Sequence, residues 1–74
     1  MTLDCRGQRC PQPVIELARA AKTSSDGTTI RILTDDPAAA IDIPAWCRMR
    51  RHHCVVVTDI DGVLTHDVTI TRTA

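Results

Sequence analysis

Cysteine is the residue type of this chain best suited to covalent chemistry, and it occurs at positions 5, 10, 47 and 54. A thiol becomes a nucleophile when it ionises. Cys10 directly precedes Pro11-Gln12-Pro13, where a helix is predicted to begin, and it follows Arg6 and Arg9. The positive end of a helix dipole and two arginines would favour the thiolate. Cys10 is therefore the candidate nucleophile, with Arg6 and Arg9 as its supporting cations.

Ionisation by itself is a weak catalyst at this position. Lowering a thiol pKa from about 8.5 to about 7 raises the thiolate fraction roughly 16-fold, while the intrinsic nucleophilicity falls about fivefold. The net gain is only about threefold. Efficient transfer therefore requires a partner protein that positions the reacting sulfurs. A carrier that docks on enzymes is thus favoured over a free-standing catalyst. Pro11 and Pro13 would fix the backbone beside the thiol and shape the docking edge.

The other cysteines leave several interpretations open. Cys5 is either a small buried strand residue, which we favour, or a resolving thiol for Cys10. Cys47 and Cys54 are better explained by packing. A zinc site built from the four cysteines and a histidine is a less favoured alternative.

Length and composition restrict the class of protein. The 74 residues suffice for one domain, residues 1–74, and 43% of them are apolar. There is no Phe or Tyr and one Trp, so Val, Ile, Leu and Ala must form a small core. The net charge of zero gives no overall attraction to nucleic acid or membranes. With no signal peptide or spanning segment apparent, we expect a cytoplasmic protein, most simply a monomer.

The hydrophobic periodicity predicts six elements in the order βαβαββ. Strands are expected over residues 3–5, 28–34, 54–58 and 63–71, the last two forming a hairpin around Asp59–Gly62. One helix should run to Lys22 with Cys10 as its N-cap and Pro11 as its first residue. The other should run from Asp35-Asp36 to Met49, with Pro44 kinking or splitting it. This order predicts a two-layer α/β (α+β) sandwich, with two helices on one face of a four-stranded mixed sheet.

Particular positions carry further predictions. The expected inward positions are Val14, Leu17, Ala18 and Ala21 on the first helix and Ala39, Ile43, Trp46 and Cys47 on the second. Asp35 and Asp36 are explained as helix caps. His66 should be partly tucked at an edge of the sheet rather than act as a base.

Three segments together resemble the TusA/SirA-like family of sulfur carriers. They are Leu3-Asp4-Cys5-Arg6-Gly7-Gln8-Arg9-Cys10-Pro11-Gln12-Pro13, with the family's Cys-Pro-x-Pro hallmark, Thr34-Asp35-Asp36-Pro37-Ala38-Ala39, and Asp42-Ile43-Pro44-Ala45-Trp46-Cys47. The resemblance implies the same sandwich and a sulfurtransferase role in which Cys10 carries sulfane sulfur as a persulfide. It implies a donor such as a cysteine desulfurase or rhodanese-like protein, and an acceptor sulfurtransferase in tRNA thiolation, sulfur oxidation or molybdenum-cofactor supply. It implies no metal or organic cofactor.

Two departures from the family pattern stand out, and a different function remains open. Gln12 occupies a position that is often acidic in the family. Arg51 stands where a glycine would suit a left-handed helix end, so it either strains or changes that turn. The alternative is a non-catalytic regulatory or RNA-binding module using the basic cluster Arg48, Arg50, Arg51, His52 and His53. Because no aromatic platform accompanies these residues, we expect no stable nucleic-acid partner.

Overall fold

The structure is a computed structural model that describes residues 1–9 and 11–71. Six elements follow one another in the predicted βαβαββ order: β1 (Thr2–Cys5), α1 (Gln12–Lys22), β2 (Thr29–Thr34), α2 (Ala39–Arg50), β3 (His53–Ile60) and β4 (Val63–Thr69). The last strand ends at Thr69, two residues earlier than predicted. Neither helix has the length and apolar character that crossing a bilayer requires.

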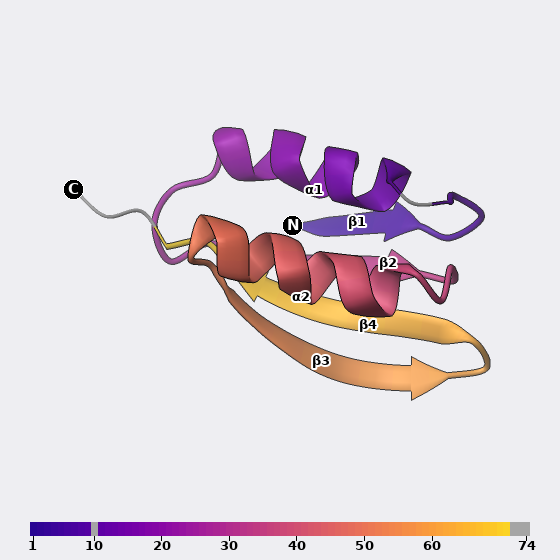
Figure 1. The fold of residues 1–74 in the computed structure, drawn as a ribbon. Helices are drawn as coiled ribbons and strands as arrows, with labels where there is room; N and C mark the ends of the chain where they lie inside the picture. Colours follow the sequence, from indigo (N-terminus) through magenta and orange to yellow (C-terminus); the bar gives the residue numbers. More distant parts are fainter. Residues whose placement is uncertain (10, 72–74) are drawn as a thin grey trace.

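The four strands form one mixed sheet in the order β1-β2-β4-β3. β1 and β2 are parallel, whereas β4 lies between β2 and β3 and is antiparallel to both. Both helices run in the same direction across the sheet, so their N-terminal ends share one end of the molecule and their C-terminal ends the other (Figure 1). The two-layer fold is confirmed.

One hydrophobic core lies between the helices and the covered face of the sheet. On β2, Ile30 and Ile32 are buried while Arg31 between them faces the open side and pairs with Asp67 at 2.8 Å. Of the predicted inward helix positions, Val14 and Ala18 are partly buried and the others are buried. Besides Pro13, the buried apolar side chains of the described residues are Cys5, Leu17, Ala21, Ile30, Ile32, Ala39, Ile43, Trp46, Cys47, Val68 and Ile70. The alternating apolar residues of β2 and the helically spaced apolar residues of α1 and α2 thus pack in the same core.

The turns follow local backbone chemistry. Asp61 and Gly62 both have positive φ, 53° and 77°, in the two-residue connection between Ile60 and Val63. Such a pair is typical of the type I′ hairpin turn. Arg51 ends α2 in the left-handed conformation, with φ 61° and ψ 33°. Arg51 therefore keeps the turn that a glycine would favour and adopts the strained conformation itself.

Pro44 lies inside α2, which is one continuous helix. Of the two expected effects of Pro44, a kink or a split, the split is wrong. A proline removes one helical hydrogen bond at a cost of about 3 kcal/mol. The carbonyl that loses its donor belongs to exposed Ala40, where water can replace it. Burial of Ile43, Trp46 and Cys47 on the same helix offsets the remaining cost.

His66 is fully buried on an interior strand, which corrects its expected position at an edge of the sheet. It lies opposite Ile32 on β2 and Val56 on β3. Neither ring nitrogen has a hydrogen-bond partner, and the hydroxyl of buried Thr34 on the neighbouring strand also lacks one. Burial lowers the pKa of His66, so the ring is held neutral inside the protein.

Candidate functional site

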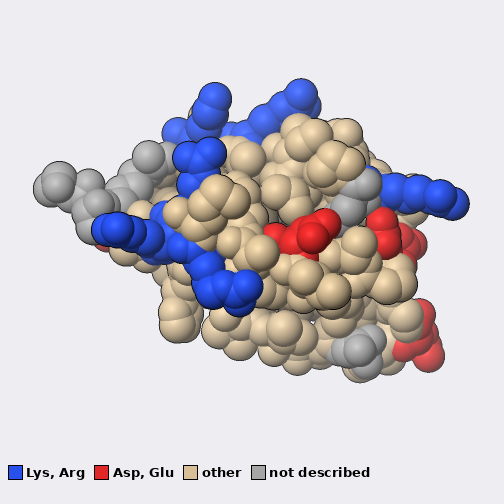
Figure 2. Space-filling model, viewed as in Figure 1, with Lys and Arg blue, Asp and Glu red and all other residues tan. Residues whose placement is uncertain are grey.

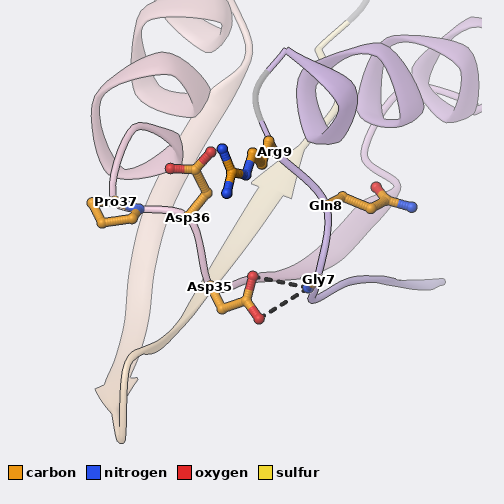
Figure 3. Close-up of a pocket in the computed structure, with 6 residues that line it drawn as sticks. All are labelled: Gly7, Gln8, Arg9, Asp35, Asp36 and Pro37. Carbon is orange, nitrogen blue, oxygen red and sulfur yellow. Dashed lines mark hydrogen bonds between the residues drawn. The ribbon is translucent and has the colours of Figure 1, made fainter.

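The candidate site forms where β1 and β2 end side by side. The parallel register places Cys5 opposite Thr34, so the chain leaves both strands at the same edge of the sheet. The two exit loops enclose a cavity of about 500 Å³ lined by Gly7, Gln8, Arg9, Asp35, Asp36 and Pro37 (Figure 3). This cavity adjoins the segment that leads into position 10.

Asp35 connects the loop after β2 to the loop after β1 through hydrogen bonds. Gly7 has φ 83° and closes a turn in which the Gln8 N–H donates to the Cys5 carbonyl at 3.2 Å. The Gly7 N–H then donates to both carboxylate oxygens of Asp35 at 2.9 Å each, as the dashed lines of Figure 3 show. A carboxylate that receives a backbone N–H makes a stronger bond than a neutral acceptor does. Asp35 therefore positions the loop that precedes Cys10.

The prediction that Asp35 and Asp36 both cap the second helix is only half correct. The Asp36 carboxylate accepts from the Ala38 N–H at 3.0 Å, and its carbonyl accepts from the Ala39 N–H at 2.9 Å. Asp36 thus stabilises the turn that starts α2, although the N-cap itself is Ala38. The contact of Asp35 was missed because it depends on the pairing of β1 with β2, which brings residues 28 positions apart together.

Helix α1 begins one residue later than predicted. Pro11, not Cys10, is the N-cap, and Pro13 is the second residue of the helix. The Gln12 N–H donates to the Arg9 carbonyl at 2.9 Å, and the Ile15 N–H donates to the Pro11 carbonyl at 3.0 Å. Because proline has no N–H, few amides in the first turn of α1 could donate a hydrogen bond to a thiolate. The dipole of α1 would then be the main way in which the helix stabilises a thiolate.

The two prolines have different environments. Pro11 is exposed and can contribute to a docking surface. Pro13 is among the fully buried residues. It therefore offers no side-chain surface to a partner, and its role in shaping the backbone of the docking edge stays a prediction.

The two candidate arginines also differ. The Arg6 guanidinium donates to both oxygens of the Asp4 carboxylate at 2.8 and 2.7 Å. This hydrogen bonding lowers the pKa of Asp4 to about 2 and raises that of Arg6. The charge of Arg6 is therefore largely balanced by its neighbour. Arg9 lines the cavity, where its side chain points toward Asp36 (Figure 3).

Cys10 itself lies outside the described residues, so its role remains a prediction. The three described cysteines are free thiols whose pKa values are raised. Burial raises the pKa of Cys5, with smaller contributions from Glu16 and Asp4. Burial and the adjacent Cys54 raise the pKa of Cys47 to about 12. Burial also raises that of Cys54. These three thiols are poor nucleophiles near neutral pH.

The remaining sequence candidates are a metal site and the basic cluster. Among residues 1–9 and 11–71, no three His, Cys, Asp or Glu side chains gather as metal ligands would. The basic cluster of residues 48–53 spans the C-terminal end of α2 and the start of β3, at the end of the molecule opposite the cavity. The single tryptophan near it is only 8% exposed.

The described part of the chain is a small two-layer α/β protein in which Cys5, Cys47 and Cys54 are free thiols with raised pKa values. The family model described as sulfurtransferase TusA matches residues 1–72. The chain therefore belongs to the TusA sulfurtransferase family, as the sequence resemblance indicated. The crystal structure of a SirA-like protein from Desulfitobacterium hafniense superposes with a TM-score of 0.83 at 22% identity, covering 96% of this chain and 97% of that one. This likeness supports the fold.

Proposed function

We propose that this protein is a sulfur carrier in which Cys10 accepts sulfane sulfur as a persulfide and passes it to another protein. The observation that carries the proposal is the family match across residues 1–72 of a chain with Cys-Pro-x-Pro at the entry to α1. The family supports sulfur transfer in general, and the motif supports Cys10 as the attacking group.

The proposed step exchanges one sulfur–sulfur bond for another. The Cys10 thiolate attacks the outer sulfur of a donor persulfide, the bond between the two donor sulfurs breaks, and the donor leaves as a thiolate. Cys10 then holds the outer sulfur as a persulfide, which a thiolate of the acceptor attacks in the same way. No external oxidant or reductant is consumed. The donor would be a cysteine desulfurase or rhodanese-like protein and the acceptor a sulfurtransferase.

The proposal gives roles to residues that lie near Cys10 in the sequence. Arg9, beside the cavity, would attract the anionic persulfide, and exposed Pro11 would contact the partner. Arg6 would contribute less, because Asp4 balances its charge. Asp35 would keep the loop in place through Gly7. The raised pKa values of the other three thiols support Cys10 as the group that reacts.

Mass spectrometry after incubation with a cysteine desulfurase and cysteine tests the proposal. Wild type should gain the mass of one sulfur atom, and Cys10→Ser should gain none. The matched variants Cys5→Ser, Cys47→Ser and Cys54→Ser should load like wild type. Equal loading of Cys10→Ser and wild type would show that another group carries the sulfur.

A further inference from the structure

A groove between the C-terminal halves of the two helices has no part in the chemistry proposed above. Its volume is about 160 Å³, and its lining consists of Ala18, Ala21, Lys22, Trp46, Arg50 and His52. Alanines and the tryptophan ring supply an apolar floor, while Lys22 on α1 and Arg50 on α2 supply two exposed cations. The groove thus combines a place for an apolar group with positive charge from both helices.

The floor of the groove is held in place by defined contacts. Trp46 is 8% exposed, and its ring centroid lies 5.2 Å from that of His52. His52 Nδ1 in turn accepts a hydrogen bond from the Thr71 N–H at 3.1 Å. A cavity of about 150 Å³ can hold a molecule of the size of benzene, so one branched aliphatic side chain fits here.

Carbonyl groups at the ends of both helices accept hydrogen bonds from nearby residues. At the end of α1, the Ala20 carbonyl accepts from the hydroxyls of Thr23 and Ser24 at 3.2 and 2.8 Å. At the end of α2, the Arg48 and Cys47 carbonyls accept backbone N–H groups of residues 51 and 52 at 3.2 and 2.8 Å. Local donors therefore satisfy these carbonyls, and the heads of Lys22 and Arg50 are exposed.

The charges of this neutral chain are unevenly distributed. Most of the Lys and Arg atoms visible in Figure 2 lie around the C-terminal ends of the helices, whereas the Asp and Glu atoms lie toward the other end. Besides Lys22 and Arg50, this end carries exposed Arg48 and Arg51, with Asp26 as the carboxylate in the loop after α1. A concentrated positive field attracts anionic groups even when the whole molecule is neutral.

We propose that this groove binds an acidic segment of a partner protein, with one apolar side chain against Trp46 and carboxylates on Lys22 and Arg50. The inference rests on the proposed carrier function for its biological meaning, since a carrier must dock on its donor and acceptor. Helix α1 has 11 residues and is about 16 Å long. The groove lies at the C-terminal end of this helix, and Pro11 caps its N-terminal end, so a partner that bound both ends would make two separated contacts.

An acidic protein segment fits these observations better than RNA does. Binding of single-stranded RNA draws on aromatic rings that stack with bases. The only tryptophan is almost fully buried and already contacts His52, and the chain has no Phe or Tyr. The groove therefore offers charge and a small apolar floor, but no stacking surface.

Titration of the full chain with the peptide acetyl-Glu-Glu-Leu-Glu-Glu-amide, followed by Trp46 fluorescence, tests the inference. Wild type should show saturable binding that weakens with added salt, and replacing the peptide leucine by alanine should weaken it further. The double variant Lys22→Glu/Arg50→Glu should bind at least about tenfold more weakly. The neutral variant Lys22→Gln/Arg50→Gln should fall between them.

Arg19→Glu is the matched control, because Arg19 is on the same helix but pairs with Glu16 at 3.5 Å outside the groove lining. It should change affinity by no more than about twofold. Equal losses in the control and the double variant would overturn the inference, as would tighter binding of a uracil hexanucleotide than of the peptide. A wild-type dimer in sedimentation that the double variant dissociates would instead identify a second copy as the occupant and overturn it too.

The test also separates this inference from the proposed function. Lys22→Glu/Arg50→Glu should still accept sulfur from glutathione persulfide at the wild-type rate, because the groove lies at the end of α1 opposite its Pro11 N-cap. Loss of peptide binding with retained loading supports the groove as a docking surface. Peptide binding that persists in Cys10→Ser, which should not load sulfur, likewise supports docking as a separate property.

Discussion

At the scale of single residues, Asp35 shows how a side chain outside the motif can govern the loop that carries the motif. Its carboxylate receives the Gly7 N–H through both oxygens. This contact connects the end of β2 to the segment before Cys10. The precision of a reacting group depends on such supporting contacts, because small displacements slow a bimolecular transfer strongly.

Asp35→Ala should therefore slow the loading of sulfur by a cysteine desulfurase. An exposed hydrogen bond contributes about 0.5–1 kcal/mol, which corresponds to a rate loss of about two- to fivefold. Asp35→Asn should be intermediate, because it keeps one acceptor. Asp42→Ala, an exposed carboxylate on α2, is the control and should load at the wild-type rate. Identical rates for both alanine variants would contradict the role of Asp35.

His66 is a second residue whose environment has a measurable consequence. It is completely buried, and both of its nitrogens lack hydrogen-bond partners. Because burial lowers its pKa in the folded chain, the unfolded chain binds a proton at higher pH than the folded chain does. The contribution of His66 to stability is thus fully present above about pH 6.5 and is lost as the pH falls below it.

His66→Leu should flatten this acid-side loss of stability. In urea denaturation at several pH values, the wild type should lose up to about 1.4 kcal/mol per pH unit from this group below pH 6.5. The variant should lack that component and gain about 1–2 kcal/mol near neutral pH, because no buried polar atom remains without a partner. His53→Leu, an exposed position on β3, should keep the wild-type slope. A variant at position 66 that kept this slope would assign the acid sensitivity to other groups.

At the scale of elements, helix α2 tolerates two unfavourable features. Pro44 removes a hydrogen bond from its interior, and Arg51 ends it in a left-handed conformation. The buried face of Ile43, Trp46 and Cys47 stabilises the helix sufficiently for both. A substitution at the C-terminal end of α2 could relieve the strain at Arg51 without changing the core.

Arg51→Gly should stabilise the protein for this reason. A left-handed conformation costs a residue with a side chain about 1–2 kcal/mol, and the greater freedom of glycine in the unfolded chain offsets part of the gain. We expect a net increase of about 0.5–1 kcal/mol in the free energy of unfolding, measured by urea denaturation. Arg50→Gly, one residue earlier in helical conformation, should instead destabilise by up to about 1 kcal/mol. Destabilisation by both changes would contradict this account of the turn.

At the scale of the whole molecule, the core is small and mostly aliphatic, with Trp46 as its one large aromatic ring and the thiols of Cys5 and Cys47 and the ring of His66 also buried. Domains of this size have little stability to lose, because their cores contribute only a few kcal/mol beyond the entropy cost of folding. The central position of Ile32, between β1 and β4 and under the helices, makes it a sensitive probe.

Ile32→Ala should leave most of the chain unfolded at 37 °C. The loss from truncating a buried isoleucine is about 2–5 kcal/mol, comparable with the whole stability expected here. Ile32→Val should cost about 1 kcal/mol and retain the fold. Trp46 fluorescence reports both, and Ile41→Ala at a 72% exposed position should stay within about 0.5 kcal/mol of wild type. A cooperative, stable Ile32→Ala protein would show that the core has more reserve than its size indicates.

The molecule also has two distinct ends. The cavity beside Arg9 and Asp35 lies where the helices begin, and the basic groove of Lys22 and Arg50 lies where they end. Because both helices run in the same direction, their positive dipole ends lie at the end with the cavity and their negative ends lie at the end with the cations. The tertiary arrangement therefore separates the proposed chemistry from the proposed docking groove.

The order of elements, a turn within Asp59–Gly62 and the inward side of both helices could be predicted from the sequence, because these depend on local periodicity and backbone preference. The sequence also pointed to the family through motifs. Only the tertiary structure decided that β4 lies between β2 and β3, that His66 and Pro13 are buried, and that Asp35 binds Gly7. Each of these depends on pairing between distant segments, and local propensity carries no information about which segments meet.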